Sequence, residues 1–503
     1  MSTTTPGTDL VDPDDGFGES VQRNAIAEYS GNGLPDTTQA SRSPAVLSDV
    51  DGSFGYIVPP RHRLRLRPAP AWPIVALIAF WPLWWAAGLG AFILPILSVP
   101  MAVILLRRRP LKLPPGFGIW VLFLIWSIGG IALLGLQAPH TVNSSGITRL
   151  LPFLLRNIDY LAATITLIYV GNQSDRIMSR SRLIRLLGLL FVYTVIGGLL
   201  GLLVPHLSFT SPVERILPGF LRSNQYVLTL VHPATAQIQD VLGKTAPRPE
   251  APFEYTNTWG NNLSILLPWF VIAWGLIGKT WQKWWTPVVI FIACVPIVYS
   301  LNRGLWIGLG LSIAYVCWRA LVAGKPAIPL AILGAAVVVL GLLAVSPLGA
   351  TFQSRLQHPH SNSIRSSLSS QAIDAALSSP FVGYGSTRAA IGSSQTIGVG
   401  KSVTCAQCGN PPIGSNGQLW LLLIANGFIG TALYFGFFLY PMWRYRRDVT
   451  PVGIAGRLVL LLSLLYSLVY SVSISTLGLY ALSMALLWRN DQAGRRSLAT
   501  DEA

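Results

Sequence analysis

Long apolar runs, separated by short polar connections, fill most of the sequence after residue 70. A helix needs about 17–25 mostly apolar residues to cross the roughly 30 Å hydrocarbon core of a bilayer. The pattern therefore predicts an all-α polytopic membrane protein with about 12 transmembrane helices. The closely spaced runs within 71–106 and 453–488 fit either two crossings or one re-entrant hairpin each. The twelve runs are 71–89, 90–106, 117–137, 150–171, 184–204, 260–278, 286–301, 304–322, 327–345, 417–441, 453–470 and 472–488.

Polar segments divide the chain into regions. Residues 1–60 are rich in Ser, Thr, Asp, Gly and Pro and show no sustained periodicity and no signal-peptide pattern, so we expect a disordered acidic tail. Residues 61–490 form the expected membrane domain, and 491–503 a second tail. Two long polar segments interrupt the membrane domain, 205–259 and 346–416, and both are large enough to hold a site.

Basic residues gather at alternate ends of the apolar runs. If the first tail is cytoplasmic, 23 of the 34 Lys and Arg residues beyond residue 60 fall in short cytoplasmic loops. Short loops rich in Lys and Arg remain in the cytoplasm. We therefore expect a multi-pass protein of the cytoplasmic membrane with both termini cytoplasmic. The segments 205–259 and 346–416 then become two large extracytoplasmic loops.

Composition excludes the other classes of protein. Of 503 residues, 51% are hydrophobic and only 11% are charged, and the mean hydropathy is +0.52. Soluble proteins carry about 25% charged residues, so this chain could not cover an aqueous surface. The net charge of +16 comes from bases at the ends of apolar runs, since residues 1–60 are net −7. We expect membrane lipids and no nucleic acid as partners.

Two arginines lie at predicted outer ends of apolar runs. Arg303 lies directly before the run 304–322, and Arg248 precedes the run 260–278. A charge at the membrane boundary is costly unless it has a partner or a use. A guanidinium matches two phosphate oxygens at once. The two arginines therefore fit a clamp for a phosphate-bearing lipid, and snorkelling to lipid headgroups is the alternative.

Four segments resemble, in order, motifs of the O-antigen ligase/polymerase superfamily. Residues 302–308 resemble its Ser-Arg-Gly-x-Trp-Leu-Gly element, and 248–257 resemble its Arg-x-x-Gly-x-Phe-x-x-Pro-Asn stretch. Residues 365–385 resemble its Arg…Ala…Pro-Leu-Leu-Gly-x-Gly run, and 415–430 resemble its His-Asn-x-x-Leu…Gly-Leu-Ile-Gly segment. The resemblance covers about residues 245–440, and the expected helix count and outer loop before the tenth helix agree with it.

The resemblance implies a GT-C type membrane glycosyltransferase. Family members move a glycan from a polyprenyl-pyrophosphate carrier to a glycan or lipid acceptor, in cell-envelope polysaccharide assembly, without metal or cofactor. For this chain it implies that Arg248 and Arg303 bind the pyrophosphate and stabilise charge on the leaving group. Arg365 would add a third cation. The resemblance does not decide between ligase and polymerase.

One departure from the family concerns the base. Family ligases carry a histidine near the start of the tenth helix, where this chain has Asn416, or Ser415 if the register slips by one. Neither side chain is a base near neutral pH. Three explanations stay open. Another group, Glu254, His358 or His360, accepts the proton; or the pyrophosphate leaves without base help; or the protein is a divergent, non-catalytic member.

The second long loop holds residue types that bind zinc. Two histidines, His358 and His360, precede Cys405 and Cys408, which form a Cys-x-x-Cys pair. The loop is expected outside the cytoplasm, in an oxidising compartment, where a disulfide is the simpler fate of two cysteines. We therefore expect a Cys405–Cys408 disulfide and no metal.

A lipid-linked glycan flippase or other transporter is the alternative from another functional class, because it also uses about a dozen helices. Outer loops as long as 205–259 and 346–416 are unusual for alternating access, and the sequence shows no internal repeat. The other GT-C architecture places an acidic dyad in the first outer loop, whereas residues 88–90 contain no carboxylate. Glycosyl transfer is therefore the predicted function.

Overall fold

The structure is a computed structural model that describes residues 70–108, 110–143, 145–223, 225–240, 245–345, 360–389 and 412–501. The chain divides into two units, Met1–Leu64 and Arg65–Ala503, and every element named below belongs to the second. The predicted disordered tail lies outside the described residues, as do 346–359 and 390–411 of the second predicted loop.

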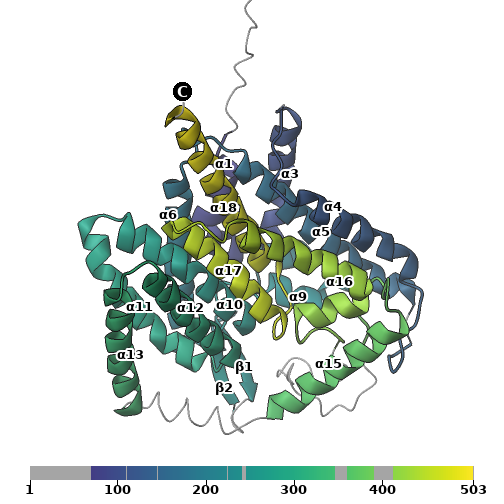
Figure 1. Ribbon diagram of the computed structural model, residues 1–503. Coiled ribbons are helices and arrows are strands. Elements are labelled where there is room, and N and C mark those ends of the chain that lie inside the picture. Colours follow the sequence, from purple (N-terminus) through teal and green to yellow (C-terminus); the bar gives the residue numbers. More distant parts are fainter. Residues whose placement is uncertain are drawn as a thin grey trace, which may run out of the picture. The chain divides into compact units, whose positions relative to one another are not determined.

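Helices make up most of the described chain (Figure 1). The first half contains α1 (Trp72–Ala79), α2 (Trp81–Ala86), α3 (Ile93–Leu106), α4 (Phe117–Gly129), the 3-10 helix η1 (Gly130–Leu133), α5 (Gly146–Gly171), α6 (Arg180–Leu203), α7 (Pro212–Ile216), α8 (Gly219–Arg222), α9 (Gln225–Val231) and the strands β1 (Ala236–Asp240) and β2 (Thr245–Pro249). The second half contains α10 (Thr256–Phe270), the π-helical η2 (Val271–Leu276), α11 (Thr280–Tyr299), α12 (Arg303–Val322), α13 (Ala327–Val345), α15 (His360–Ser378), α16 (Gln418–Arg444), α17 (Pro451–Ser467) and α18 (Ile474–Asp501).

Five of the described helices are long and apolar enough to cross a membrane, namely α5, α6, α11, α12 and α16. Large apolar side chains are also exposed along the helices, for example Leu122, Trp284 and Val337. Extended exposed apolar surface is rare on a protein surrounded by water. These features fit a membrane-embedded protein, and the mostly helical prediction is confirmed.

Each of the twelve predicted apolar runs contains helix, but several are short or broken. The run 71–89 holds α1 and α2, which part at Phe80, and the run 260–278 holds α10 followed by η2. None of these pieces reaches crossing length alone. The count of twelve crossings therefore stays a prediction.

Helix starts follow from local capping. The side chains of Ser179, Asn302 and Thr450 each accept a hydrogen bond from the backbone N–H three residues later, at 3.1, 3.2 and 3.1 Å. These N–H groups have no partner inside their helix, so a capping side chain stabilises the first turn. The three caps begin α6, α12 and α17.

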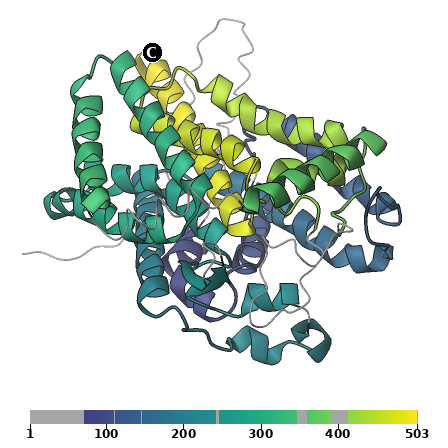
Figure 2. The same ribbon diagram turned by 90° about the horizontal axis from the view of Figure 1, so that it is seen from below.

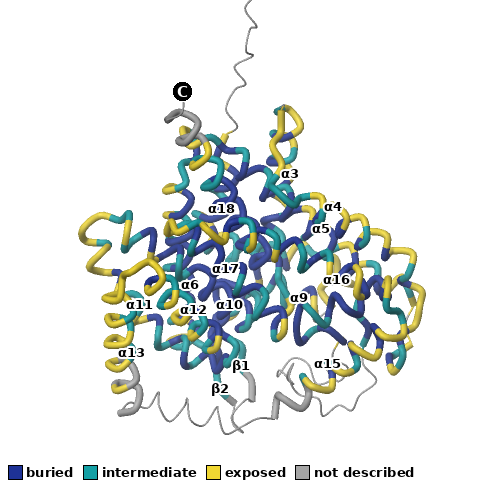
Figure 3. Tube along the Cα trace, in the orientation of Figure 1, coloured by how far each residue is buried: buried dark blue, intermediate teal, exposed yellow. Residues whose placement is uncertain are grey.

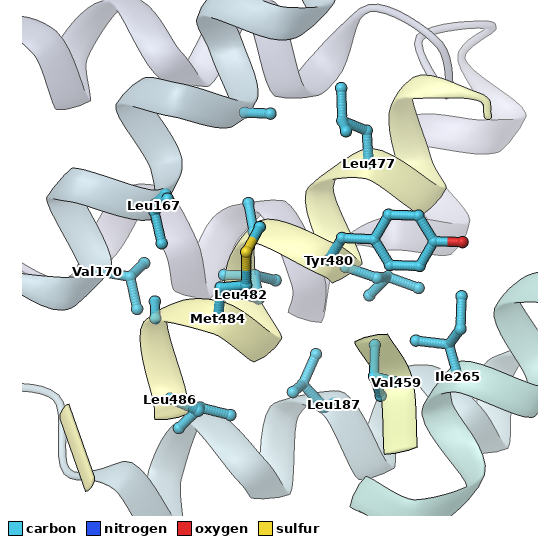
Figure 4. Close-up of a cluster of buried hydrophobic side chains, with 14 of the residues drawn as sticks. Leu167, Val170, Leu187, Ile265, Val459, Leu477, Tyr480, Leu482, Met484 and Leu486 are labelled. Atoms are coloured by element: carbon cyan, nitrogen blue, oxygen red, sulfur yellow. The ribbon is translucent and has the colours of Figure 1, made fainter. Parts of the chain in front are cut away.

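One large apolar core joins helices from both halves of the chain. Figure 3 shows buried residues where α6, α10, α17 and α18 meet, and exposed residues along α11 and α13. The helices α11 to α13 and the helix α4 lie at opposite sides of this core (Figures 1 and 2). Figure 4 shows side chains of the core, including Leu167, Val170, Leu187, Ile265, Val459, Leu482 and Leu486.

Polar side chains inside the core connect α10 to α18. Asn262 donates to Ser475 Oγ at 3.1 Å and accepts from Thr476 Oγ1 at 2.7 Å. Trp269 Nε1 donates to Ser483 Oγ at 3.1 Å. Helices in lipid gain little from apolar contact alone, so such hydrogen bonds help to fix their pairing.

The first predicted loop is folded rather than irregular. It contains three short helices, α7 to α9, and β1 pairs antiparallel with β2, with Gln237 opposite Arg248. The strict all-α prediction was therefore wrong for this segment. Pro247 and Pro249 lie in β2 itself, and prolines this close together exclude a helix interior but are compatible with an edge strand.

A break inside α16 receives part of the second loop. Gly427 has φ +64° and ψ −169°, outside the helical region, and only glycine takes this conformation without strain. The backbone N–H groups of Tyr384 and Gly385 donate to Ile424 and Ala425 carbonyls at 2.8 Å each, and Phe428 N–H donates to a carbonyl of the loop. The segment 380–385 thus pairs with the broken helix and satisfies its freed backbone groups.

Candidate active site

Arg248 lies on β2 with its side chain turned inward. The residue is 9% exposed, and Nε donates to the carbonyl oxygen of Ser300 at 2.7 Å. Ser300 directly follows α11. Arg248 therefore joins the hairpin to the α11–α12 connection, which also leads into Arg303.

Arg303 is the first residue of α12, and the preceding Asn302 caps that helix. Asn302 is 4% exposed and also accepts a hydrogen bond from the Tyr470 hydroxyl. Its Nδ2 donates to Asn257 Oδ1 of α10 at 3.5 Å. Tyr470 lies between α17 and α18. Three parts of the bundle therefore meet at the residue beside Arg303.

Arg365 reaches the same region from α15. Its Nη1 donates to the carbonyl oxygens of Val469 at 2.6 Å and Asn416 at 3.4 Å. Asn416 Nδ2 donates in turn to the Arg365 carbonyl at 3.2 Å and to Ser369 Oγ at 2.8 Å. Burial lowers the pKa of Arg365, and the nearby Tyr470 partly opposes that shift. Arg365 and Asn416 thus hold α15 against the start of α16.

The three arginines named from the sequence lie in one neighbourhood around Tyr470. Arg248 and Arg365 both act electrostatically on Tyr470, and Arg303 follows the residue that bonds its hydroxyl. We call Arg248, Arg303 and Arg365 the arginine cluster. Its members come from β2, α12 and α15, and β2 and α15 both lie at the lower edge of Figure 1. Asn416 belongs to this neighbourhood through its contact with Arg365.

Glu254 lies in an acid-lined pocket next to the arginine cluster. The pocket has about 330 Å³ of space, its mouth included, and its walls include Trp85, His232, Glu250, Phe253 and Glu254. Burial raises the pKa of Glu254 to about 7. Its Oε2 atom is shielded from solvent and has no hydrogen-bond partner in the described part of the chain. A carboxyl group with such a pKa can accept a proton near neutral pH.

Glu250 connects the pocket to the arginine cluster. It lies two residues after Arg248, and burial raises its pKa, with the charge of Glu254 adding to the rise and that of Arg248 opposing it. Burial also raises the pKa of Tyr226, and Asp159 and Glu254 raise it further. The acidic groups therefore lie near one another and beside an arginine.

Sequence reasoning missed a histidine–carboxylate pair whose histidine lines the same pocket. His232 Nδ1 lies 2.7 Å from Glu214 Oε2, and Glu214 is 8% exposed. The two residues belong to the short helix α7 and to the turn after α9, 18 positions apart. No periodicity links residues at that spacing, so no signal in the sequence pointed to the pair.

A second set of buried arginines has a structural role. Arg388 is 2% exposed and donates to the carbonyl oxygens of Tyr384, Ser386 and Leu136, each at 2.9 Å. Burial and the nearby Arg149 lower the pKa of Arg388 to about 10. The bonds of Arg388 fasten the loop that enters the break in α16 to the turn after η1.

The predicted Cys405–Cys408 disulfide and the candidate base His358 lie outside the described residues, and His360 is described only as the first residue of α15. Across the described ranges, no group of three or more His, Cys, Asp or Glu side chains is close enough together to hold a metal ion. The disulfide and the two histidines therefore stay predictions.

Comparison with known proteins identifies no relative. No protein-family model matches the sequence, and no curated protein matches it. The resemblance to the O-antigen ligase/polymerase superfamily therefore rests on the four sequence segments alone.

Proposed function

We propose that the protein transfers or polymerises a glycan from a polyprenyl-pyrophosphate carrier onto a glycan or lipid acceptor. The reaction takes place at the outer face of the cytoplasmic membrane, in a chain that crosses it about twelve times with both termini inside. The observation that supports the proposal is the arginine cluster. Arg248 and Arg365 come together at Tyr470 from distant segments, and Arg303 directly follows Asn302, which bonds the Tyr470 hydroxyl. Each arginine matches a position of the motifs that resemble the ligase/polymerase family.

The arginine cluster suits a pyrophosphate leaving group. When the bond from the anomeric carbon to the pyrophosphate oxygen breaks, negative charge grows on that oxygen. Guanidinium groups already fixed in place stabilise this charge more strongly than they stabilise the bound donor, which lowers the barrier. Arg248 and Arg365 are fixed by their bonds to the Ser300 and Val469 carbonyls.

Glu254 is the proposed base on the acceptor side. Its pKa of about 7, raised by burial, leaves the carboxylate ready to accept a proton from an acceptor hydroxyl at neutral pH. Asn416 has another task, since its amide donates to the Arg365 carbonyl and to Ser369. We assign Asn416 to positioning Arg365 rather than to proton transfer.

Release of polyprenyl pyrophosphate tests the proposal. Purified protein in nanodiscs receives lipid-linked glycans extracted from the cells that make it, and the released carrier is measured. Arg303→Ala should lower turnover about a hundredfold, as does loss of one donor that stabilises a transition-state charge. Arg303→Lys should recover part of the activity, because it keeps the charge but loses the two-pronged contact.

The control is Arg222→Ala, an exposed arginine of the predicted outer loop 205–259 that bonds only to neighbouring carbonyls in its described contacts. It should leave turnover unchanged. Full release by Arg303→Ala would contradict the proposal. Movement of intact lipid-linked glycan between leaflets, without release, would favour the flippase.

A further inference from the structure

The acid-lined pocket is a folded site and not a surface depression. Its walls come from the turn between α2 and α3, from the end of α9 and from the segment between β2 and α10. Ser211, which is fully buried, caps α7 and donates to the Val231 carbonyl at 2.6 Å. This bond sets Glu214 of α7 against His232, so the histidine is held with one ring nitrogen on a carboxylate.

A buried carboxyl group of the pocket has an unfilled hydrogen-bonding position. Glu254 Oε2 is shielded from solvent and has no partner in the described part of the chain. Glu250, which is 7% exposed, lines the same pocket. Buried polar groups are nearly always hydrogen-bonded, so the open position at Glu254 points to a ligand that fills it.

The remaining wall defines the chemistry of that ligand. Trp85 and Phe253 present aromatic rings on the same pocket, and both are themselves braced by ring contacts, with Phe209 at 6.0 Å and Trp81 at 5.7 Å between centroids. An apolar ring surface beside convergent carboxyl and imidazole groups suits a molecule with a flat C–H face and several hydroxyls.

We propose that this pocket binds a sugar ring of the acceptor, with Glu250 and His232 accepting or donating hydrogen bonds to its hydroxyls and Glu254 facing the hydroxyl that reacts. The inference rests on the proposed function. Arg248 lies two residues before Glu250, so an acceptor held here lies beside a donor held by the arginine cluster. In the reaction the acceptor oxygen bonds to the anomeric carbon. The carbon–oxygen bond to pyrophosphate breaks with its electron pair on the pyrophosphate, and the acceptor proton passes to Glu254.

A binding experiment tests the pocket separately from turnover. The probe is the set of oligosaccharides released by mild acid from lipid-linked glycans of the same cells, so that they carry no pyrophosphate. Saturation-transfer NMR on protein in nanodiscs measures their binding. Wild type should bind, and Glu250→Gln and His232→Ala should each weaken binding at least fivefold, while Arg303→Ala should leave it unchanged.

Matched controls are Asp374→Asn, an exposed acid on α15, and His206→Ala, an exposed histidine near the end of α6. Both should bind like wild type, and size-exclusion chromatography should show that every variant is folded. The inference would be overturned if the pocket variants bound the sugar as well as wild type, or if wild type did not bind it. It would also be overturned if tetramethylammonium displaced the sugar. Carrier release by wild type without pocket-dependent sugar binding would overturn the inference alone. Pocket-dependent binding without carrier release would overturn the proposed function and leave a sugar site.

Discussion

The side chain of Asn302 accepts a hydrogen bond from the Leu305 N–H, takes another from the Tyr470 hydroxyl and donates to Asn257. Asn302→Ala should therefore lose a helix cap, which costs about 1–2 kcal/mol, and leave the buried Tyr470 hydroxyl unpaired. We expect a lower thermal unfolding midpoint in detergent. Asn302→Asp keeps an acceptor for both bonds, so its unfolding midpoint should fall less. Equal losses in the two variants would contradict the capping role.

Because Glu254 is buried, the stability of the folded protein should fall as the pH rises through the pKa of this carboxyl group. Burial raises its pKa from 4.5 to about 7. Between these values the folded protein binds more protons than the unfolded chain. The stability linked to protonated Glu254 is complete below about pH 4.5 and is lost as the pH rises through 7. Glu254→Gln should therefore raise the unfolding midpoint at pH 8 and change it little at pH 4.5.

Differential scanning fluorimetry across this pH range measures the effect of Glu254. Part of the slope, meaning the change of the unfolding midpoint with pH, should remain in Glu254→Gln, because burial raises the pKa of Glu250 as well. The exposed control Asp374→Asn should keep the full wild-type slope. A wild-type slope in Glu254→Gln would show that the carboxyl is solvated.

The packing of α12 on α17 depends on two glycines four residues apart, Gly304 and Gly308. A Cβ at Gly304 would overlap the hydroxyl of Tyr470. Gly308 is buried, and a Cβ there would overlap the hydroxyl and ring of Tyr466, whose hydroxyl donates to Ser264 at 2.8 Å. Small residues four apart let two membrane helices approach closely. Gly308→Ala should therefore displace Tyr466 and lower the free energy of unfolding by about 1–3 kcal/mol.

The control for Gly308→Ala lies on the same helix. A Cβ at Gly310 meets nothing within 4 Å, so Gly310→Ala should be neutral or stabilising. The thermal unfolding midpoints of the two variants, prepared side by side, separate the effect of close packing from that of helix propensity. Similar destabilisation in both would assign the effect to the backbone and not to Tyr466.

At the scale of elements, apolar runs predicted the helices well because burial in lipid and helix formation require the same residues. The break in α16 was not predicted, since Gly427 leaves the helical region only to receive the backbone of 380–385. The hairpin of β1 and β2 was also missed. The prolines of β2 excluded a helix there. The position of β2 also depends on its packing against α6, which the sequence pattern does not encode.

At the scale of the whole molecule, motif resemblance selected the three arginines but did not predict the acid-lined pocket beside them. Arg248, Arg303 and Arg365 were named one by one, and their approach to Tyr470 depends on how β2, α12, α15 and the connection between α17 and α18 are arranged. His232 and Glu214 carried no local signal. Single residues of a site can thus be inferred from chemistry and position in a run, whereas their partners require the tertiary structure.

Membrane orientation is the last prediction, and the contacts between helix ends support it. Arg489 pairs with Asp175 at 2.7 Å, and Arg444 pairs with Asp491 at 3.8 Å. These contacts gather the start of α6, the end of α16 and the far part of α18 at one end of the bundle. All three carry bases assigned to the cytoplasm by the positive-inside rule. The arginine cluster lies on connections assigned to the opposite side.

A reporter enzyme active only outside the cytoplasm, fused after Asn410, should therefore be active, whereas the same enzyme fused after Asp448 should be inactive. A reporter that needs the cytoplasm should give the reverse result at both positions. Only α16 separates the two fusion points among the described elements, so the pair of fusions tests whether that helix crosses the membrane and in which direction. Activity of the first reporter after Asp448 and not after Asn410 would place the arginine cluster in the cytosol, where a lipid-linked glycan exported to the outer leaflet could not reach it.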